Sequence, residues 1–235
     1  MLPKEIIPNP LLSSTVELRF QNEFSLEFVD KILPSKLQQE FNMLKEDRPS
    51  ENSSLDTSNN IVFKNEMFLV AIDKKSMIFE NVKNYQLWGN YFAFIKNVIN
   101  SISDQDIQSS VERVGIRYIS FFAKTDKVTM ILKKPFLMVE DEIGEITDSS
   151  FYGNFTFQRN LYRCSIQIGN KIQFPGESDV KEGCVIDLDV SISDNLPRFK
   201  TTALFDIIDS LHDEEKGLFV AVMSEDFLNS LTIKY

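Results

Sequence analysis

The chain has 235 residues, of which 43% are hydrophobic, and a formal net charge of −10 at pH 7. This length and composition allow one large domain or two small ones with a sizeable apolar core. The negative charge argues against general nucleic-acid binding and against binding to anionic membranes, because both need a positive electrostatic field.

Cysteine usage and the N-terminal sequence indicate the compartment. Cys164 and Cys184 are the only cysteines, and they do not form a C-x-x-C motif. The first residues show no basic segment followed by an apolar one, as a signal peptide would. We therefore expect a reduced, cytoplasmic protein. Because no apolar run approaches the roughly 18 residues of a membrane-spanning helix, no membrane partner is expected.

The first elements are predicted from prolines and hydrophobic periodicity. Three prolines among the first ten residues predict an extended lead-in segment. Alternating apolar side chains predict a strand over Thr15–Phe20. A helix is expected from a Ser25 cap to Phe41, with a break or kink at Pro34. The polar, turn-rich stretch Leu44–Asn60 predicts a mobile surface loop.

The next elements complete a ferredoxin-like pattern. A hairpin is predicted from Ile61–Lys64 and Met67–Asp73, and a further strand from Met77–Glu80. Tyr85–Ile102 carries the strongest helical stripe of the chain, and the strand Val111–Phe122 follows it. This order is that of a ferredoxin-like βαββαβ unit, although the extra strand leaves a different α+β sandwich open.

After residue 124 the pattern is mostly that of strands. The candidates are Val128–Leu132, Phe136–Val139, Gly153–Gln158, Tyr162–Ile168 and Cys184–Ser193. Glu140–Ser150 and Gln173–Gly183 are predicted to be surface loops. Thr202–Met223 predicts one long amphipathic helix, and Ser224 predicts the cap of a short helix over Glu225–Leu231.

Together these elements predict an α+β protein with mixed or antiparallel sheets and packed helices. Residues 1–124 form the ferredoxin-like N-terminal half, and residues 125–235 form an antiparallel sheet followed by the long C-terminal helix. The two halves are expected to pack as one unit. No repeat of short fixed period is present, which excludes a solenoid. A diverged duplication of one α+β half stays open.

The strand Val111–Phe122 presents a charged face opposite an apolar one. Arg113 and Arg117 share the charged face and lie about 13 Å apart along an extended strand. Gly115 lies between them and is expected to leave the surface open. Such a spacing could grip an extended acidic ligand.

Two further strands supply charged candidates for the same surface. Asp187 and Asp189 share one face of a strand in the second half, and Glu17 and Arg19 share one face of the first strand. In a common or facing sheet, the arginines of the central strand and the two aspartates would form cross-strand pairs. Exposed pairs contribute only about 0–1 kcal/mol each. A structural role is favoured, and all six charged residues are kept as candidates for binding a ligand or partner.

No constellation identifies catalytic residues. Asp187 and Asp189 could act as a general acid/base pair or hold magnesium, but alternating aspartates usually form only a polar face. His212 is the only histidine, which excludes a histidine-based zinc site, and it is expected to pack or cap. Cys164 and Cys184 read as small core residues. Glycine motifs that cradle phosphate are absent. Neither a metal nor a cofactor is predicted.

Several short motifs occur together over nearly the whole chain. They are Pro8-Asn9-Pro10 followed by Glu17, Arg19 and Phe20; Tyr85 with Trp88; Arg113-Val114-Gly115-Ile116-Arg117-Tyr118; Asp187-Leu188-Asp189; and Leu211-His212 leading to Phe219. In content and order they resemble the motifs of a sporadically distributed family of uncharacterised bacterial proteins. The resemblance implies no particular chemistry. The patchy distribution of that family is similar to that of mobile-element and defence-associated genes.

These observations favour a non-enzymatic, macromolecule-binding protein of the bacterial cytosol, acting in defence or toxin neutralisation. A protein partner with a basic surface suits the acidic charge, and the oligomeric state is not predicted. The alternative is an enzyme or small-molecule binder with a charged pocket between the two halves; a weaker one is a nucleic-acid-processing module. A deep charged pocket would favour the enzyme, and an exposed apolar patch on an outer helix or sheet would favour the binder.

Overall fold

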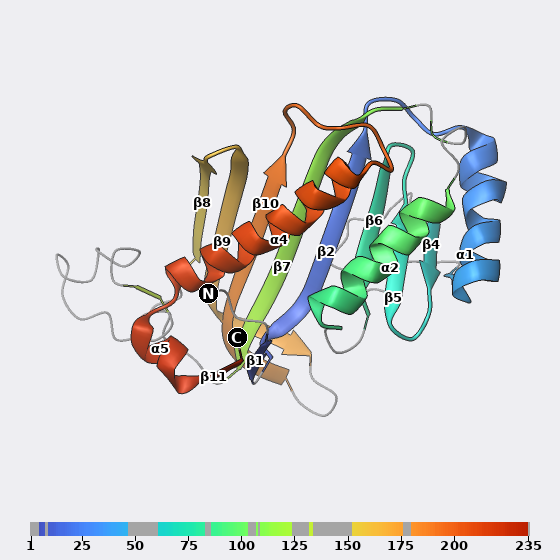
Figure 1. Ribbon diagram of the computed structural model, residues 1–235. Helices are drawn as coiled ribbons and strands as arrows, with labels where there is room; N and C mark the ends of the chain where they lie inside the picture. The colour runs from blue at the N-terminus through green and yellow to red at the C-terminus, as the bar shows by residue number, and fades with distance from the viewer. Residues whose placement is uncertain are drawn as a thin grey trace. The chain divides into compact units, whose positions relative to one another are not determined.

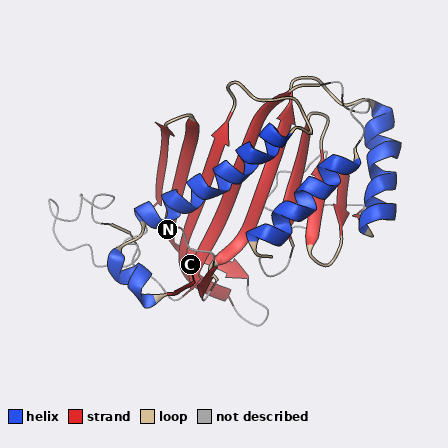
Figure 2. Ribbon diagram, viewed as in Figure 1, coloured by secondary structure: helices blue, strands red, loops and turns tan. Residues whose placement is uncertain are grey.

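The computed structural model describes residues 5–7, 9–46, 61–82, 86–102, 107, 109–123, 132–133, 152–175 and 180–234. Strands and helices both occur in these segments (Figure 1 and Figure 2). The strands are β1 (Glu5–Ile7), β2 (Leu11–Phe20), β3 (Leu44–Glu46), β4 (Ile61–Lys64), β5 (Phe68–Ile72), β6 (Ser76–Asn81), β7 (Val111–Ala123), β8 (Tyr152–Arg159), β9 (Tyr162–Pro175), β10 (Val180–Ile192) and β11 (Thr232–Lys234). The helices are the π-helix η1 (Phe28–Ile32), α1 (Leu33–Phe41), α2 (Trp88–Ser101), α4 (Thr202–Val222) and α5 (Glu225–Ser230).

The strands of the described segments form two sheets. β1 pairs with β11, and the other nine strands follow the hydrogen-bonded order β3-β4-β5-β6-β2-β7-β10-β9-β8. The pairs β2–β6, β3–β4, β4–β5, β5–β6 and β8–β9 are antiparallel. The predicted α+β class, with helices and a large antiparallel sheet, is therefore confirmed.

The strand order contains a repeat. From β2 the order runs through β6 and β5 to β4, and from β7 it runs through β10 and β9 to β8. Along the chain, α2 follows β6 and α4 follows β10. A duplicated half would produce this succession, so the order supports the duplication that the sequence left open.

The chain forms two compact units that interleave along the sequence. Unit 1 comprises Met1–Leu12, Arg117–Val190 and Asp213–Tyr235, and unit 2 comprises Ser13–Ile116 and Ser191–His212. β2, β7, β10 and α4 therefore contribute residues to both units. The division of the chain near residue 124 stays a prediction.

In unit 2 the helix α2 packs on the sheet through a stripe of apolar residues. The buried members of the stripe are Tyr91, Phe94, Ile95, Val98 and Ile99. Phe68 of β5 stacks on Phe94 with ring centroids 4.2 Å apart. The Tyr91 hydroxyl donates a hydrogen bond to the Phe79 carbonyl at 2.6 Å, so the polar end of this buried ring is satisfied.

The opposite face of β4, β5 and β6 is also apolar. Val62, Leu69, Ala71 and Ile78 form a buried cluster there. The register pairs Val62 with Ala71 and Ala71 with Ile78. Because side chains alternate along a strand, this cluster and the residues under α2 lie on different faces. All five residues of β5 are therefore buried.

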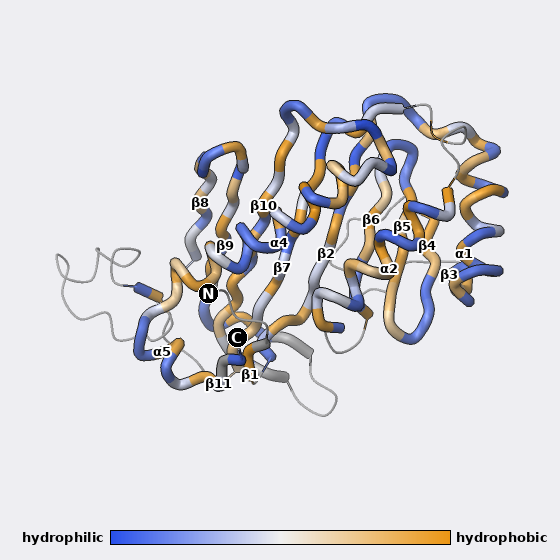
Figure 3. Tube along the Cα trace, viewed as in Figure 1, coloured by the Kyte–Doolittle hydropathy of each residue, from blue (hydrophilic) through white to orange (hydrophobic). Residues whose placement is uncertain are grey.

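The first helical segment of unit 2 begins at Ser25 as predicted. Its hydroxyl accepts a hydrogen bond from the Phe28 N–H at 3.1 Å. The π-helix η1 changes to the α-helix α1 beside Pro34. The helical backbone continues through Pro34, so the helix does not break there; the hydrogen-bond register changes instead, because proline has no N–H for the preceding turn. Figure 3 shows polar and apolar residues alternating along α1, as in a helix with one buried face.

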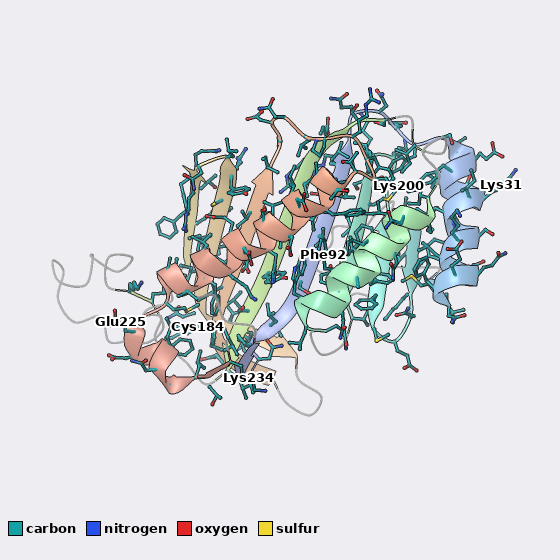
Figure 4. The ribbon with its side chains drawn as sticks, in the orientation of Figure 1. Lys31, Phe92, Cys184, Lys200, Glu225 and Lys234 are labelled. Atoms are coloured by element: carbon teal, nitrogen blue, oxygen red, sulfur yellow. The ribbon has the colours of Figure 1, made fainter. Side chains whose placement is uncertain are left out.

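In unit 1, β9, β10 and the second part of α4 each carry buried apolar residues. The buried residues are Cys164, Ile166, Ile168, Cys184, Ile186 and Leu188 on the strands and Leu218, Phe219 and Val222 on the helix. α5 follows α4, and its cap Ser224 accepts a hydrogen bond from the Phe227 N–H at 3.2 Å. Figure 4 labels Cys184 on β10 and Glu225 at the start of α5. α4 and α5 occupy the two segments predicted as helices.

Two predicted loops are wrong in part, because strands extend into them. The first three residues of the predicted loop Leu44–Asn60 form β3, where Leu44 pairs with Lys64 of β4. In the predicted loop Gln173–Gly183, β9 continues to Pro175 and β10 begins at Val180. A strand with one solvent-facing side accepts polar residues, so polarity alone does not separate it from a loop.

Other sequence predictions lie outside the described residues. These are residues 47–60 of the first loop, the strand Phe136–Val139, the loop Glu140–Ser150 and most of the strand Val128–Leu132. Of the last strand, Leu132 is described, and it forms an isolated antiparallel bridge with Met223.

Candidate functional site

The strand β7 has the two faces that its sequence predicts. Val114, Ile116 and Tyr118 are buried, while Arg113 and Arg117 are partly exposed on the other face. The period of two along an extended strand produces this separation. The two arginines belong to different compact units, and each has its own carboxylate partner.

In unit 1, Arg117 binds Asp187 of β10 through two parallel hydrogen bonds. Its Nε lies 2.9 Å from Oδ1 and its Nη2 lies 2.6 Å from Oδ2. The Asp187 hydrogen bond raises the pKa of Arg117; burial opposes the rise, and the charges of Asp187 and Asp189 add to it. Asp187 is 8% exposed, whereas the Arg117 side chain is 40% exposed. The predicted contact between Arg117 and the acidic strand is confirmed.

In unit 2, Arg113 forms an ion pair with Glu17 of β2 through Nη1 and Oε2. Arg19 donates from Nη2 to the other oxygen of the same carboxylate, Oε1, at 2.9 Å. Glu17 thus serves two guanidinium groups. The sequence pattern predicted Asp187 and Asp189 as the partners of Arg113. The ion pair between Arg113 and Glu17 was not predicted.

The expectation that Gly115 leaves an open surface is wrong. A Cβ atom at Gly115 would lie 2.6 Å from Arg113 Nη1 and 2.9 Å from its Cζ. The Arg113 guanidinium therefore folds back over this glycine and fills the space. Glycine permits this close approach because it has no side chain.

The chemistry of these ion pairs favours a structural role. Each guanidinium already holds a carboxylate, through two hydrogen bonds for Arg117 and through Nη1 for Arg113. An acidic ligand would compete with Glu17 or Asp187 for the guanidinium groups, and separating the buried Asp187 carboxylate from its arginine is costly. Five of the six charged candidates take part in these contacts, Arg117 with Asp187 and both Arg113 and Arg19 with Glu17, while Asp189 adds its negative charge near Arg117.

His212 packs in unit 2 against α2. Its ring stacks on Trp88 with centroids 3.9 Å apart and planes 11° apart, and it is buried. Trp88 Nε1 donates to Asp209 Oδ1 at 2.7 Å, and the indole also stacks on Phe92 with ring centroids 5.1 Å apart. The packing role predicted for His212 is confirmed. The two cysteines are free thiols in the core, where burial raises the pKa of Cys164.

Glu215 is a buried carboxyl group that the sequence analysis missed. It lies on α4 in unit 1, is 2% exposed, and has its pKa raised by burial to about 8, against the opposing charge of Lys216. At neutral pH the group is therefore mostly protonated. Glu215 follows Leu211 by four residues and precedes Leu218 by three, so it lies on the same inward-facing side of the helix as these two leucines. This helical spacing is the sequence signal from which its burial could have been predicted.

β8 is the second feature that the sequence analysis missed. All of its residues except Gly153 are exposed. Tyr152 is 68% exposed and Phe157 37%, and Leu161 in the following turn is 70% exposed. Within the described segments β8 is last in the strand order and pairs with β9 alone. Unit 1 therefore ends in an exposed edge strand with aromatic side chains.

Comparison with known proteins leaves function to be argued from geometry. No family model matches the chain, and no curated protein matches its sequence. In the described part of the chain, no three His, Cys, Asp or Glu side chains are placed to hold a metal ion together. None of the helices described is both long and apolar enough to cross a membrane.

Proposed function

We propose that this chain is a non-enzymatic protein-binding protein of the bacterial cytosol, acting in defence or toxin neutralisation, and that β8 is its binding surface. The observation that carries the proposal is the exposed, aromatic outer strand of unit 1. Exposed aromatic residues on a strand cost solvation energy, so a soluble protein that keeps them accessible has a use for them. The resemblance to a sporadically distributed bacterial family supports the setting, and the free cysteines suit a reducing compartment.

The charged surface supports the alternative function less well. An enzyme or small-molecule binder built on Arg113, Arg117, Asp187 and Asp189 would need charged groups that converge on a ligand. Arg117 already holds Asp187, and Arg113 already holds Glu17. β8 presents accessible apolar area, which suits a protein partner better.

We further infer a ferredoxin-like N-terminal half and a C-terminal half of antiparallel strands followed by α4. In a ferredoxin-like βαββαβ unit the last strand neighbours the first, which neighbours the third and then the second. The order β7-β2-β6-β5 has this form, with α1 and α2 as the two helices. β4 and β3 extend that sheet.

Affinity capture from the native host tests the proposed function. Full-length chain and the variant Phe157→Lys are compared, with Leu44→Lys as the matched control. Leu44 is 75% exposed on β3, the strand at the other end of the sheet order. We expect one specific protein to be captured by the wild type and by Leu44→Lys, and lost with Phe157→Lys. Equal capture by all three would exclude β8 as the binding surface, and equal folding is checked by circular dichroism.

A further inference from the structure

The hairpin register shows which backbone groups of β8 face outward. Arg159 pairs with Tyr162 across the two-residue turn Asn160–Leu161. Residues that flank such a turn form a hydrogen-bonded pair, and hydrogen-bonded and non-hydrogen-bonded pairs then alternate along the hairpin. The N–H and C=O groups that point away from β9 therefore belong to Tyr152, Asn154, Thr156 and Gln158.

In its own sequence, β8 lacks three features by which proteins block strand pairing. Such features are short length, proline, and charged side chains, lysine above all. β8 has eight residues, contains no proline or lysine, and has one charged residue, Arg159. Arg159 Nε lies 2.8 Å from Glu214 Oε1 of α4, so this charge is engaged in an ion pair within unit 1. By contrast β3 has three residues, two of them charged.

We propose that β8 is a strand-addition site, at which an extended segment of a basic partner protein pairs with the outer edge of β8 and lengthens the sheet. This inference rests on the proposed function and names the mode of binding and the chemistry of the partner. Main-chain hydrogen bonds to Asn154, Thr156 and Gln158 supply affinity, and side chains on the two faces supply specificity.

The side chains of β8 and the net charge of the protein indicate which kind of partner segment would pair with this edge. Phe155 and Phe157 lie on the same face as Arg159, which reaches α4, and they favour aromatic or β-branched residues in the added strand. Asn154, Thr156 and Gln158 on the other face favour hydroxyl and amide side chains. The net charge of −10 attracts a basic protein and repels a second copy of this chain. The edge itself contains no acidic residue, so the main chain of a partner can approach it closely.

Peptide binding to the full-length protein tests strand addition. The probe is a fluorescent peptide of roughly ten residues, alternating valine and threonine with lysines at both ends. Three matched peptides serve as controls. Two of them carry N-methyl groups on the backbone amides, one peptide along one edge of the strand and the other along the opposite edge. In the third control peptide, glutamates replace the lysines. We expect the lysine peptide to bind at least about tenfold more tightly than the glutamate peptide and than one of the methylated peptides.

The variant Thr156→Pro removes one outward N–H and should weaken binding of the lysine peptide by about tenfold or more. Because the methylated peptides need no change in the protein, they test the same hydrogen bonds if this variant folds poorly. Equal binding of both methylated peptides and the parent, or absence of binding by all four, would contradict the proposal. A wild-type dimer in sedimentation that Thr156→Pro converts to monomer would assign the edge to a second copy and overturn it too.

The capture experiment separates the two proposals. A partner lost with Phe157→Lys but retained by folded Thr156→Pro would leave the proposed function standing and refute strand addition. A partner retained by both variants would refute both. A partner lost with both variants, together with the peptide preferences above, supports both.

Discussion

β5 and β8 belong to the same sheet but differ in how much of each strand is exposed to solvent. All five residues of β5 are buried, since α2 covers one face and the cluster of Val62, Leu69, Ala71 and Ile78 lies on the other. β8 is exposed along nearly its whole length. Both strands contain aromatic residues, but β5 is otherwise entirely apolar, whereas the aromatic residues of β8 alternate with glycine and polar residues. Within the described segments β5 has a strand on each side, whereas β8 pairs with β9 alone and exposes its outer edge.

The units that contain these strands also differ in their buried polar groups. Unit 2 buries neutral groups with hydrogen bonds, such as Asn81, whose amide donates to the Ser14 hydroxyl at 2.7 Å. The buried carboxyl groups of the described residues, Asp187 and Glu215, both belong to unit 1. The stability of unit 1 should therefore depend on its buried carboxyl groups, whereas unit 2 buries His212 and holds the Glu17 carboxylate in partly exposed ion pairs.

Titration of Glu215 has the largest expected effect. Its pKa is about 8 in the fold, against 4.5 for an ordinary glutamate. Between these values the unfolded chain has released the proton that the native state keeps, so the free energy of unfolding falls as the pH rises. The total fall is about 5 kcal/mol, at about 1.4 kcal/mol per pKa unit. Below the lower and above the higher of these two pKa values, Glu215 does not change the free energy of unfolding with pH.

Urea denaturation at acidic and alkaline pH measures this effect. Glu215→Gln should remove the fall and should be more stable than the wild type by about 3 kcal/mol at neutral pH. Glu225 is an exposed residue of α5, so Glu225→Gln should change neither the pH dependence nor the free energy of unfolding at neutral pH. An identical pH dependence in wild type and Glu215→Gln would show that the carboxyl is not desolvated in solution.

Substitution of Gly183 has the second largest expected effect on the free energy of unfolding. A Cβ atom at this position of β10 would overlap the Phe122 carbonyl oxygen and lie 2.9 Å from its carbon, and backbone cannot move aside cheaply. We expect Gly183→Ala to lower the free energy of unfolding by about 3 kcal/mol. Gly217 on α4 has nothing within 4 Å, so Gly217→Ala should instead stabilise by about 1 kcal/mol. Two destabilising results of similar size in chemical denaturation would contradict this account.

The two ion pairs give the third prediction. Arg117→Ala leaves the buried Asp187 carboxylate without its arginine and should cost about 2 kcal/mol, reduced from a fully buried pair because water screens the half-exposed guanidinium. Arg113→Ala should cost less, below about 1 kcal/mol, because Arg19 still binds Glu17. Denaturation of both variants at equal ionic strength measures the difference. A larger loss for Arg113→Ala would reverse the assignment of charge dependence to unit 1.

Gly115→Ala has the smallest expected effect. The added methyl group would meet the Arg113 guanidinium, the far end of a flexible side chain, which can move away. The cost should stay below about 1 kcal/mol and should nearly vanish in the background Arg113→Ala. A cost that persists in that background would place the strain in the backbone of β7.

Sequence reasoning succeeded where a local pattern was sufficient. The alternation along Val111–Phe122 predicted β7 and its charged face, and the spacing from Tyr85 to Ile102 predicted α2. Caps at Ser25 and Ser224 were identified from residue type and position. It failed for β3 and for the ends of β9 and β10, because polar strands and polar loops share a composition.

For the candidate site, residue pattern placed Arg117 and Asp187 on polar faces, and the complementarity of their charges was enough to predict the contact. The partner of Arg113 depended on β2 lying beside β7, which no spacing in the chain encodes. The inward position of Glu215 could have been found from helical periodicity, but its acidic neighbours Asp213 and Glu214 concealed it.

By itself the sequence determined the α+β class, most of the elements and which side chains share a face, because these follow from periods of 2 and 3.6 along the backbone. Tertiary structure alone decided which strand is covered and which is an edge, which carboxylate meets which guanidinium, and how far Glu215 is removed from water. Those outcomes depend on contacts between residues far apart in the chain, and desolvation is a property of the packed structure.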